Sequence, residues 1–215
     1  MKTLCLFDLD GTIINPKEGI TKSVQYALKF FSIEITNLDE LQKFIGPPLR
    51  DSFREFYNFS EKETEKAVEK YREYFSEKGM YENTLYPGII DLLKQLKTDG
   101  IVLAIATSKP TFFADKIAEH FNFKRYFDFI AGSELDGARS RKSEVIEYAL
   151  DIIDPKRKKS PIMIGDRKHD IIGAKETGIE SIGVTWGYGS HIELEESNAT
   201  WIISSPKELY SIVSM

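Results

Sequence analysis

The chain has 215 residues, of which 41% are hydrophobic and 29% are charged, and its formal net charge is −5. This length is enough to bury a full core, as one domain or as one domain that carries a smaller one. The negative charge argues against a general nucleic-acid binder and against binding to anionic membranes, because both need a broad basic surface.

Cys5 is the single cysteine, which excludes an intrachain disulfide, and its place in an apolar stretch predicts a buried thiol. No stretch is long and apolar enough to cross a bilayer. Met1-Lys2 leads directly into the first predicted strand, without the apolar region of a signal peptide. We therefore expect a cytoplasmic protein whose partners include neither a membrane nor a nucleic acid.

The first predicted element is a short apolar run over residues 2–7, which ends at Asp8-Leu9-Asp10-Gly11-Thr12. An apolar run without polar alternation predicts a strand covered on both faces, as in a parallel α/β sheet. Ligands of such sheets sit at the carboxyl ends of the strands. Asp8 and Asp10 therefore predict a site for a hard divalent cation such as Mg²⁺. Taken alone, the stretch is equally consistent with an ordinary turn.

Residues 16–83 contain a succession of helix patterns and no convincing strand. Apolar residues at helical spacing predict helices over 19–31, 38–45, 49–59 and 60–78. Ser60 and Glu63 predict a capping box at the start of the last of these helices. We predict that residues 15–83 form a small helical cap domain, inserted after the first strand into a core domain of residues 1–14 and 84–215.

Strands and helices alternate after Tyr86-Pro87-Gly88. Strands are predicted over 101–106, 127–131, 161–164, 181–184 and 200–203, and helices over 89–98, 111–121 and 143–153; a further helix follows residues 165–170 and ends at Thr177. This alternation predicts an α/β fold with a doubly wound, Rossmann-like parallel sheet.

Polar residues follow three of these strands: Asp8 and Asp10, then Thr107-Ser108, then Asp166 and Asp170. If the three strands are parallel neighbours, these residues share one edge of the sheet. Such a set suits phosphoryl transfer, because a carboxylate can attack phosphorus while a cation offsets the charge of the transferring group. A second aspartate would donate a proton to the leaving alcohol and take one from the attacking water.

Three stretches, 8–12, 107–110 and 165–170, resemble in that order the first, second and fourth motifs of the haloacid dehalogenase-like superfamily. Residues 19–20, 44–49 and 86–88 further resemble its phosphoglycolate phosphatase-like branch, which has a helical cap. The resemblance covers nearly the whole chain. Asp10 argues against dehalogenation, since the hydrolytic dehalogenases of the superfamily lack this carboxylate.

The resemblance implies a role for each matching residue. Asp8 is expected to be the nucleophile and a Mg²⁺ ligand, Asp10 the general acid and base that also binds Mg²⁺ through its carbonyl oxygen, and Asp166 the residue that completes the metal site. Asp170 is expected to support that site. Thr107, together with the backbone amide of Ser108, is expected to bind the phosphoryl oxygens.

The third motif of the family is a lysine, often followed by proline, near the start of the helix before the fourth strand. Lys142 matches it best, and would bridge the nucleophile and the phosphoryl group. Because the proline is missing here, Arg141 remains the alternative. Lys109 and Arg167 flank the motifs, and each either extends a positive pocket or faces solvent.

Specificity is expected to lie in the cap. Arg50 follows the stiff loop Gly46-Pro47-Pro48, and is a candidate to bind a substrate carboxylate or a second phosphate; the alternative is an ordinary residue on a helix surface.

Together these features predict a Mg²⁺-dependent phosphomonoester hydrolase of a small phosphorylated metabolite, phosphoglycolate phosphatase-like, with an aspartyl-phosphate intermediate. The alternatives are a 5'-nucleotidase or a pyrophosphatase of the same superfamily, and less favoured ones are a phosphosugar mutase and a non-catalytic binder of a phosphorylated ligand.

Overall fold

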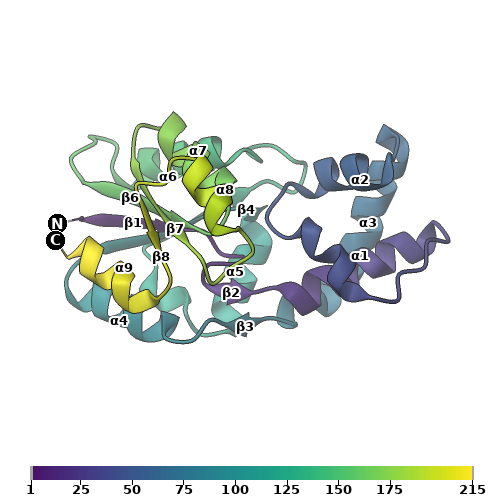
Figure 1. Cartoon of the computed structure of the whole chain (residues 1–215), viewed down its shortest axis with the longest axis horizontal. Coiled ribbons are helices and arrows are strands. Elements are labelled where there is room, and N and C mark those ends of the chain that lie inside the picture. The colour runs from purple at the N-terminus through teal and green to yellow at the C-terminus, as the bar shows by residue number, and fades with distance from the viewer. Residues whose placement is uncertain (1, 215) are drawn as a thin grey trace. The chain divides into compact units, whose positions relative to one another are not determined.

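A computed structural model describes residues 2–214 and divides into two compact units (Figure 1). One unit comprises Met1–Asn15 and Leu85–Met215, and the other comprises Pro16–Thr84. The first unit contains the sheet and the candidate site, and the second is helical. A small two-stranded sheet pairs β2 (Ile14–Asn15) with β3 (Thr84–Leu85), where the chain passes from one unit to the other.

The first unit is built on one six-stranded sheet with the strand order β5-β4-β1-β6-β7-β8. Its strands are β1 (Leu4–Phe7), β4 (Val102–Pro110), β5 (Phe129–Ser133), β6 (Pro161–Gly165), β7 (Glu180–Val184) and β8 (Trp201–Ile203). Every neighbouring pair is parallel. The predicted doubly wound, Rossmann-like α/β fold is therefore confirmed.

The order in which the chain adds strands to the sheet reverses at β1. Strands β4 and β5 extend the sheet on one side of β1, and β6, β7 and β8 extend it on the other. Phe7, the last residue of β1, is in register with Ile105 of β4 and with Ile164 of β6. The residues that follow these three positions therefore emerge together at the carboxyl edge, at the switch point where open α/β sheets bind their ligands.

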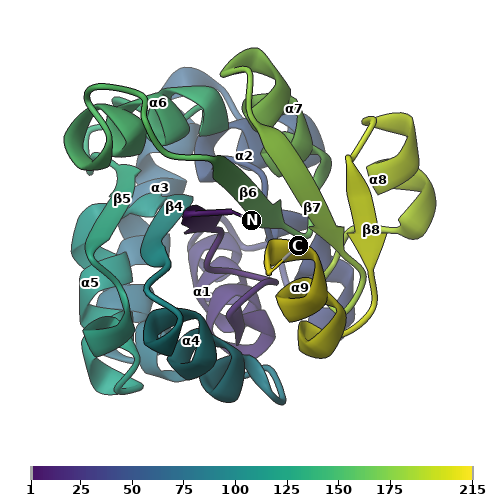
Figure 2. The ribbon, with the colours of Figure 1, turned by 90° about the vertical axis from the view of Figure 1, so that its left-hand side faces the viewer.

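Helices cover both faces of this sheet (Figure 2). Helices α6 (Lys142–Ile153) and α7 (Lys168–Glu176) lie on one face, and α4 (Ile89–Thr98), α5 (Thr111–His120) and α9 (Pro206–Val213) lie on the other. The short helix α8 (His191–Glu196) packs beside β8. Residues of α6 and α7 form one buried cluster with the alternate residues Leu4 and Leu6 of β1.

Cys5 points to the opposite face from Leu4 and Leu6 and is fully buried, as predicted. Burial raises the pKa of its thiol to about 12. A thiol with this pKa stays protonated at neutral pH, so Cys5 packs as a small apolar residue.

The second unit contains α1 (Lys17–Phe30), α2 (Leu49–Tyr57) and α3 (Glu61–Glu77), with short 3₁₀-helices at Leu38–Phe44 and Gly79–Tyr81. Gly19 and Gly79 let α1 meet the segment after α3 closely, because a Cβ on Gly19 would collide with the Gly79 carbonyl. Aromatic side chains fill much of the space between α2 and its neighbours; Phe44 contacts Phe53 and Phe56, and Phe53 stacks on Phe59.

Local predictions held where the helices are long. The capping box is present, since Ser60 accepts from the backbone N–H of Glu63 at 3.4 Å and its own N–H donates to the Glu63 carboxylate at 2.8 Å. The segment predicted as a helix over 38–45 is instead a 3₁₀-helix. It is short and runs into Gly46-Pro47-Pro48, and proline cannot continue a helix.

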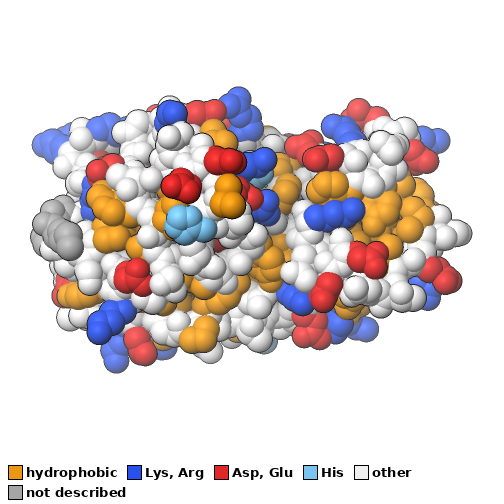
Figure 3. All heavy atoms as spheres, viewed as in Figure 1, with side chains coloured by type: hydrophobic (Ala, Val, Ile, Leu, Met, Phe, Trp, Pro, Cys, Tyr) orange, Lys and Arg blue, Asp and Glu red, His pale blue; other side chains and the backbone are white. Residues whose placement is uncertain are grey.

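On the face of the molecule shown in Figure 3, acidic and basic side chains are interspersed in both units. Within residues 2–214, no helix combines the length and the apolar character that crossing a membrane requires.

Candidate active site

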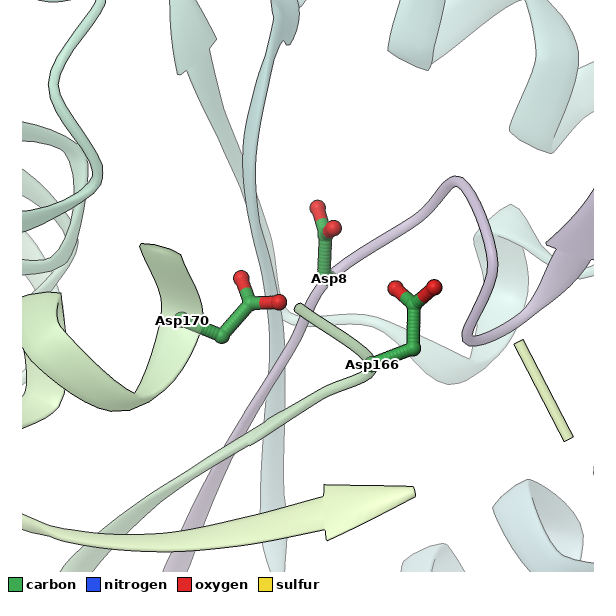
Figure 4. A group of neighbouring side chains, drawn as sticks. All are labelled: Asp8, Asp166 and Asp170. Atoms are coloured by element: carbon green, nitrogen blue, oxygen red, sulfur yellow. The ribbon is translucent and has the colours of Figure 1, made fainter. Parts of the chain in front are cut away.

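Three aspartates meet at the carboxyl edge of the sheet, at the switch point beside β1. Asp8 follows β1, Asp166 follows β6, and Asp170 lies in the first turn of α7 (Figure 4). One carboxylate oxygen from each lies within 4.8 Å of the other two. All three residues are buried, with exposed fractions of 5%, 0% and 1%. The structure therefore brings together three of the residues that the sequence predicted, over a separation of about 160 residues.

Lys142 is the cation inside this cluster. Its ammonium Nζ lies 2.8 Å from Asp8 Oδ1 and 2.8 Å from Asp170 Oδ1, and it donates to the carbonyl oxygen of Ala106 at 3.0 Å. Burial opposes the charged form, but Asp170 and Asp8 outweigh burial and raise the pKa of Lys142 above its usual value. The lysine therefore stays protonated and partly neutralises the two carboxylates that it contacts.

Arg141 points elsewhere, although it precedes Lys142. Its side chain is 69% exposed and pairs with Glu176 on α7 at 3.3 Å. Arg141 is the N-cap residue of α6, whereas Lys142 is the first residue of that helix. The start of α6 thus separates the two cations, and of these two only Lys142 contacts Asp8.

Arg139 holds the loop that leads into α6. Its Nε donates to the Gly132 carbonyl at the end of β5 at 2.9 Å, and its guanidinium also pairs with Glu134. The guanidinium carbon lies 3.8 Å from the ring centre of Tyr148 on α6. Arg139 thereby joins β5 to α6, because its partner Gly132 precedes Lys142 in the chain and its partner Tyr148 follows it.

Asp166 has both carboxylate oxygens engaged. Oδ1 accepts from the Thr12 hydroxyl at 3.4 Å, and Oδ2 accepts from the backbone N–H of Tyr188 at 2.7 Å. Burial, with the nearby charges of Asp170 and Asp8, raises the pKa of Asp166 well above its usual value. Three buried carboxylates beside a single lysine leave uncompensated negative charge, which an added cation would offset.

This donor set suits a hard divalent cation. It consists of oxygen atoms alone, it is buried, and its members come from three rigid positions of the fold. Magnesium prefers oxygen ligands and is usually held in proteins by one or two carboxylates, together with water and substrate phosphate. The residues present therefore fit the ion that the sequence predicted.

Asp10 lies apart from the three clustered carboxylates and forms its own ion pair. Its Oδ2 lies 2.9 Å from Nζ of Lys109, and both side chains are nearly buried. Burial raises the pKa of Asp10 and the charge of Asp8 adds to this, while Lys109 opposes it. Within residues 2–214, the buried Oδ1 of Asp10 has no hydrogen-bond partner.

Thr107 and Ser108 lie in the last part of β4, which continues past the end predicted at Ala106. The Thr107 hydroxyl accepts from the backbone N–H of Lys109 at 3.2 Å, and the Ser108 carbonyl accepts from the Ser133 hydroxyl at 2.8 Å. These bonds hold the irregular end of β4 beside β5. Thr107 is buried, at the same edge as Asp8.

The two flanking cations differ in their surroundings. Lys109 is buried and pairs with Asp10, whereas Arg167 pairs with Glu193 at 2.9 Å. In the helical unit, Arg50 makes a two-pronged contact with Glu65, at 2.7 and 3.0 Å.

Sequence reasoning missed one segment of the site, Thr185-Trp186-Gly187-Tyr188-Gly189-Ser190, which follows β7. Besides the bond from Tyr188 to Asp166, the Trp186 indole N–H donates to the carbonyl oxygen of Thr12 at 3.1 Å. The signal available in the sequence was the alternation of aromatic residues and glycines directly after a predicted strand. Such glycines often mark a close backbone approach.

A doubly wound sheet that gathers buried carboxylates, a lysine and a Thr-Ser pair at its carboxyl edge has the equipment for phosphoryl transfer. Residues 5–184 match the family model of the haloacid dehalogenase-like hydrolases, and the chain belongs to this family. The predicted family membership is confirmed.

Relatives and solved structures narrow the class further. The chain is 48% identical to a 5'-nucleotidase of Pseudomonas aeruginosa, over 91% of this chain and 88% of the relative. It is 36% identical to the tyrosine-protein kinase PtkA of Mycobacterium tuberculosis, over 92% of this chain and 67% of the relative. It is 26% identical to phosphoglycolate phosphatase 1 of Pseudomonas aeruginosa, over 96% of this chain and 78% of the relative.

Among solved structures, a predicted phosphatase from Clostridium acetobutylicum matches with a TM-score of 0.95 at 49% identity, over 100% of both chains. With the family match, this similarity identifies the chain as a haloacid dehalogenase-like phosphatase.

Proposed function

We propose that the chain is a Mg²⁺-dependent phosphomonoester hydrolase that works through an aspartyl-phosphate on Asp8. The observation that carries this proposal is the contact of the buried Lys142 ammonium with Asp8 and Asp170, beside Asp166. A lysine held there contacts the attacking carboxylate, and its positive charge would offset the negative charge of the phosphoryl group. The cluster therefore supports nucleophilic attack by Asp8 rather than a purely structural ion pair.

The metal would be held by Asp8, Asp166 and the carbonyl oxygen of Asp10, with Asp170 supporting the site from α7. When bound, Mg²⁺ would offset the negative charge of the phosphoryl group and of the carboxylates around it. The buried position of the three clustered carboxylates supports this assignment. Burial disfavours their ionised form, and a nearby positive charge stabilises that form.

The reaction proceeds in two displacements at phosphorus. Asp8 attacks the phosphorus, the ester bond breaks, and Asp10 donates a proton to the departing alkoxide, so that an alcohol leaves and an acyl phosphate remains. Water then attacks the phosphorus, Asp10 takes its proton, and Asp8 departs from inorganic phosphate as a carboxylate. The raised pKa of Asp10 supports this role, as does its buried Oδ1, which has no hydrogen-bond partner among residues 2–214.

Lys142, Thr107 and the backbone amide of Ser108 would bind the phosphoryl oxygens. Lys142 supplies a fixed positive charge, and the Thr107 hydroxyl is held at the same edge by the N–H of Lys109. Groups placed in advance around the transferring phosphoryl group provide most of the catalysis in this chemistry.

For the substrate we propose a nucleoside 5'-monophosphate. The relative named as a 5'-nucleotidase is 48% identical, whereas the phosphoglycolate phosphatase is 26% identical. Phosphoglycolate, the substrate favoured by the motifs, is the second candidate. It would need a cation for its carboxylate, and Arg50, the predicted cation, makes a two-pronged contact with Glu65. The helical unit, residues 16–84, would act as the cap.

The mechanism is tested by p-nitrophenyl phosphate hydrolysis with and without Mg²⁺, followed by a single-turnover reaction with labelled substrate. We expect Mg²⁺-dependent turnover, and label on the peptide that contains Asp8. Asp8→Asn should abolish both turnover and label. Label that never appears on Asp8 in the wild type would contradict the aspartyl-phosphate mechanism.

The substrate is tested by kcat/KM for a panel of nucleoside 5'-monophosphates, phosphoglycolate and pyrophosphate. We expect a nucleoside monophosphate to give the highest value. A higher kcat/KM for phosphoglycolate, lost in Arg50→Ala and retained in the neighbouring Arg54→Ala, would favour the second candidate and assign Arg50 to its carboxylate.

A further inference from the structure

The segment of residues 185–190 lies between the carboxylate of Asp166 and the loop after β1, and we call it the strap. Two aromatic side chains anchor it to the first fifteen residues of the chain. The Trp186 indole N–H donates to the carbonyl oxygen of Thr12 at 3.1 Å. The Tyr188 hydroxyl hydrogen-bonds to Oδ1 of Asn15, and also interacts with the Tyr86 hydroxyl.

Between these anchors, the backbone of the strap touches Asp166 directly. The N–H of Tyr188 donates to Asp166 Oδ2 at 2.7 Å, and this is the shortest hydrogen bond that the carboxylate accepts. A Cβ on Gly187 would collide with the Asp166 carboxylate, and one on Gly189 would collide with the Asp166 carbonyl oxygen. The strap therefore approaches Asp166 too closely for any residue but glycine at these positions.

A carboxylate that binds a metal needs a fixed orientation, since each rotation out of the productive geometry reduces affinity. The donors that orient Asp166 are the Thr12 hydroxyl on Oδ1 and the Tyr188 N–H on Oδ2. The strap is linked to both donors. It contains the Tyr188 N–H, and its Trp186 bonds to the backbone of Thr12, whose hydroxyl is the other donor. The strap thus contacts the groups that orient Asp166, in the way that outer groups orient the ligands of a metal.

We propose that Trp186 and Tyr188 are positioning residues that set the affinity of the site for a divalent cation, by holding the strap N–H on Asp166. The proposal rests on the proposed function, in which Asp166 binds Mg²⁺. Both side chains act through the strap, since Trp186 bonds to Thr12 and Tyr188 bonds to Asn15. Their loss should weaken cation binding while leaving the phosphoryl-binding groups Thr107 and Lys142 in place, since those groups lie on β4 and α6.

The experiment measures Mg²⁺ binding by isothermal titration calorimetry, without substrate, for the wild type, Trp186→Phe and Tyr188→Phe. Each variant removes one polar group and keeps an aromatic ring. We expect the Kd for Mg²⁺ to rise about tenfold in each, at the lower end of the effect of losing a group that orients a metal ligand. In kinetics, saturating Mg²⁺ should restore kcat and leave KM for the phosphorylated substrate near the wild-type value.

Matched controls are Trp201→Phe in β8 and Tyr210→Phe in α9, which alter the same residue types away from the site. Asp166→Asn should remove measurable Mg²⁺ binding. Unchanged Kd values in both strap variants, with a wild type that binds Mg²⁺, would overturn the strap inference alone. A rise of the Kd for Mg²⁺ in the two control variants, equal to that in the strap variants, would also overturn the strap inference. A wild type that binds no Mg²⁺ would overturn the proposed metal site and the inference with it.

A double-mutant cycle separates the hydrogen bond from the ring. Asn15→Ala removes the acceptor of the Tyr188 hydroxyl, and should weaken Mg²⁺ binding about as much as Tyr188→Phe does. The double variant should be no weaker than either single variant, because both remove the same bond. Fully additive losses would show that the bond between Tyr188 and Asn15 does not hold the strap.

Discussion

At the scale of single residues, Lys142 shows how burial and charge combine in this site. A buried lysine ordinarily loses its proton more easily, because the charged form is poorly solvated. Here Asp8 and Asp170 both lie 2.8 Å from its Nζ, and they outweigh burial, so the pKa is raised. The ammonium is therefore a permanent positive charge at neutral pH.

Lys142→Met should lower kcat by about 100- to 1000-fold, since it removes the fixed charge that we propose for binding the transferring group. Arg141→Met should change kcat by no more than a few fold, because the Arg141 side chain is exposed and pairs with Glu176. The measurement is steady-state hydrolysis of p-nitrophenyl phosphate at saturating Mg²⁺. Near wild-type activity in Lys142→Met would refute the role proposed for this lysine.

At the scale of elements, the loop between β5 and α6 holds the start of α6, whose first residue is Lys142. Gly137 and Arg139 both have positive φ angles, +97° and +55°, and the N–H of Glu134 donates to the Ala138 carbonyl at 2.8 Å. Arg139 then bonds to Gly132 and lies over the ring of Tyr148. The loop is thus closed on itself and anchored at both ends, without a proline.

Arg139→Gln should lower kcat about tenfold, since small shifts of a catalytic group are costly and the helix that carries Lys142 loses its anchor. Arg139→Lys should recover part of this loss, because it keeps a charge for Glu134 but loses the planar fork. Arg125→Gln is the matched control, as Arg125 lies over the Tyr126 ring away from α6. If Arg125→Gln and Arg139→Gln lose the same activity, the anchor has no specific role.

The connection between α6 and β6 depends on a different carboxylate. Asp154 is buried, and its two oxygens accept from the backbone N–H groups of Lys158 and Lys159 at 2.9 and 2.8 Å. Burial opposes ionisation, but these N–H groups, Lys159 first, outweigh it and lower the pKa of Asp154. The basic run over 156–159 is therefore tied back to the end of α6.

Asp154→Asn should lower the free energy of unfolding at neutral pH, because an amide cannot accept from both N–H groups. A lowered pKa in the folded state stabilises the fold at pH values above the unfolded pKa, about 3.9, and this contribution disappears as pH falls through the folded pKa. The difference between wild type and variant should therefore shrink below about pH 4. Urea unfolding at pH 7, 5 and 3.5 measures it, and a difference independent of pH would contradict the assignment.

At the scale of the whole molecule, the burial of three neighbouring carboxylates bears on the stability of the fold. Asp8, Asp166 and Asp170 are buried within a few ångströms of one another, and Lys142 pairs with two of them, Asp8 and Asp170. Their mutual repulsion opposes folding, and a bound divalent cation would relieve it. Stability should therefore depend on the metal as well as on the core.

Mg²⁺ at ten times its Kd should add about 1.4 kcal/mol to the free energy of unfolding, by mass action on the folded state. For a chain of this size, that corresponds to a rise in Tm of about 3 to 6 °C. Scanning calorimetry with Mg²⁺ or with EDTA measures the shift. Asp166→Asn should show no Mg²⁺-dependent shift, and a shift of the same size in this variant would falsify the assignment of Asp166 to the metal.

Much of the fold was predictable because burial leaves a local pattern. The apolar runs at 2–7, 101–106 and 161–164 correspond to β1, β4 and β6, and the capped helix starting after Ser60 is α3. Elements without such a pattern were missed: α8 is six residues long, and β2 and β3 have two residues each. Helix α9 was also missed, although Ser205-Pro206 is a recognisable helix start.

For the site, the sequence by itself determined which residue types end the strands: Asp8, Thr107 and Asp166 stand at positions where a strand pattern stops, and this can be read locally. Only the tertiary structure decided that Lys142 rather than Arg141 contacts Asp8, that Lys109 pairs with Asp10, and that the strap reaches Asp166. These contacts depend on strand register and on where a helix begins. A change of one residue in either turns a side chain away, and no local pattern records it.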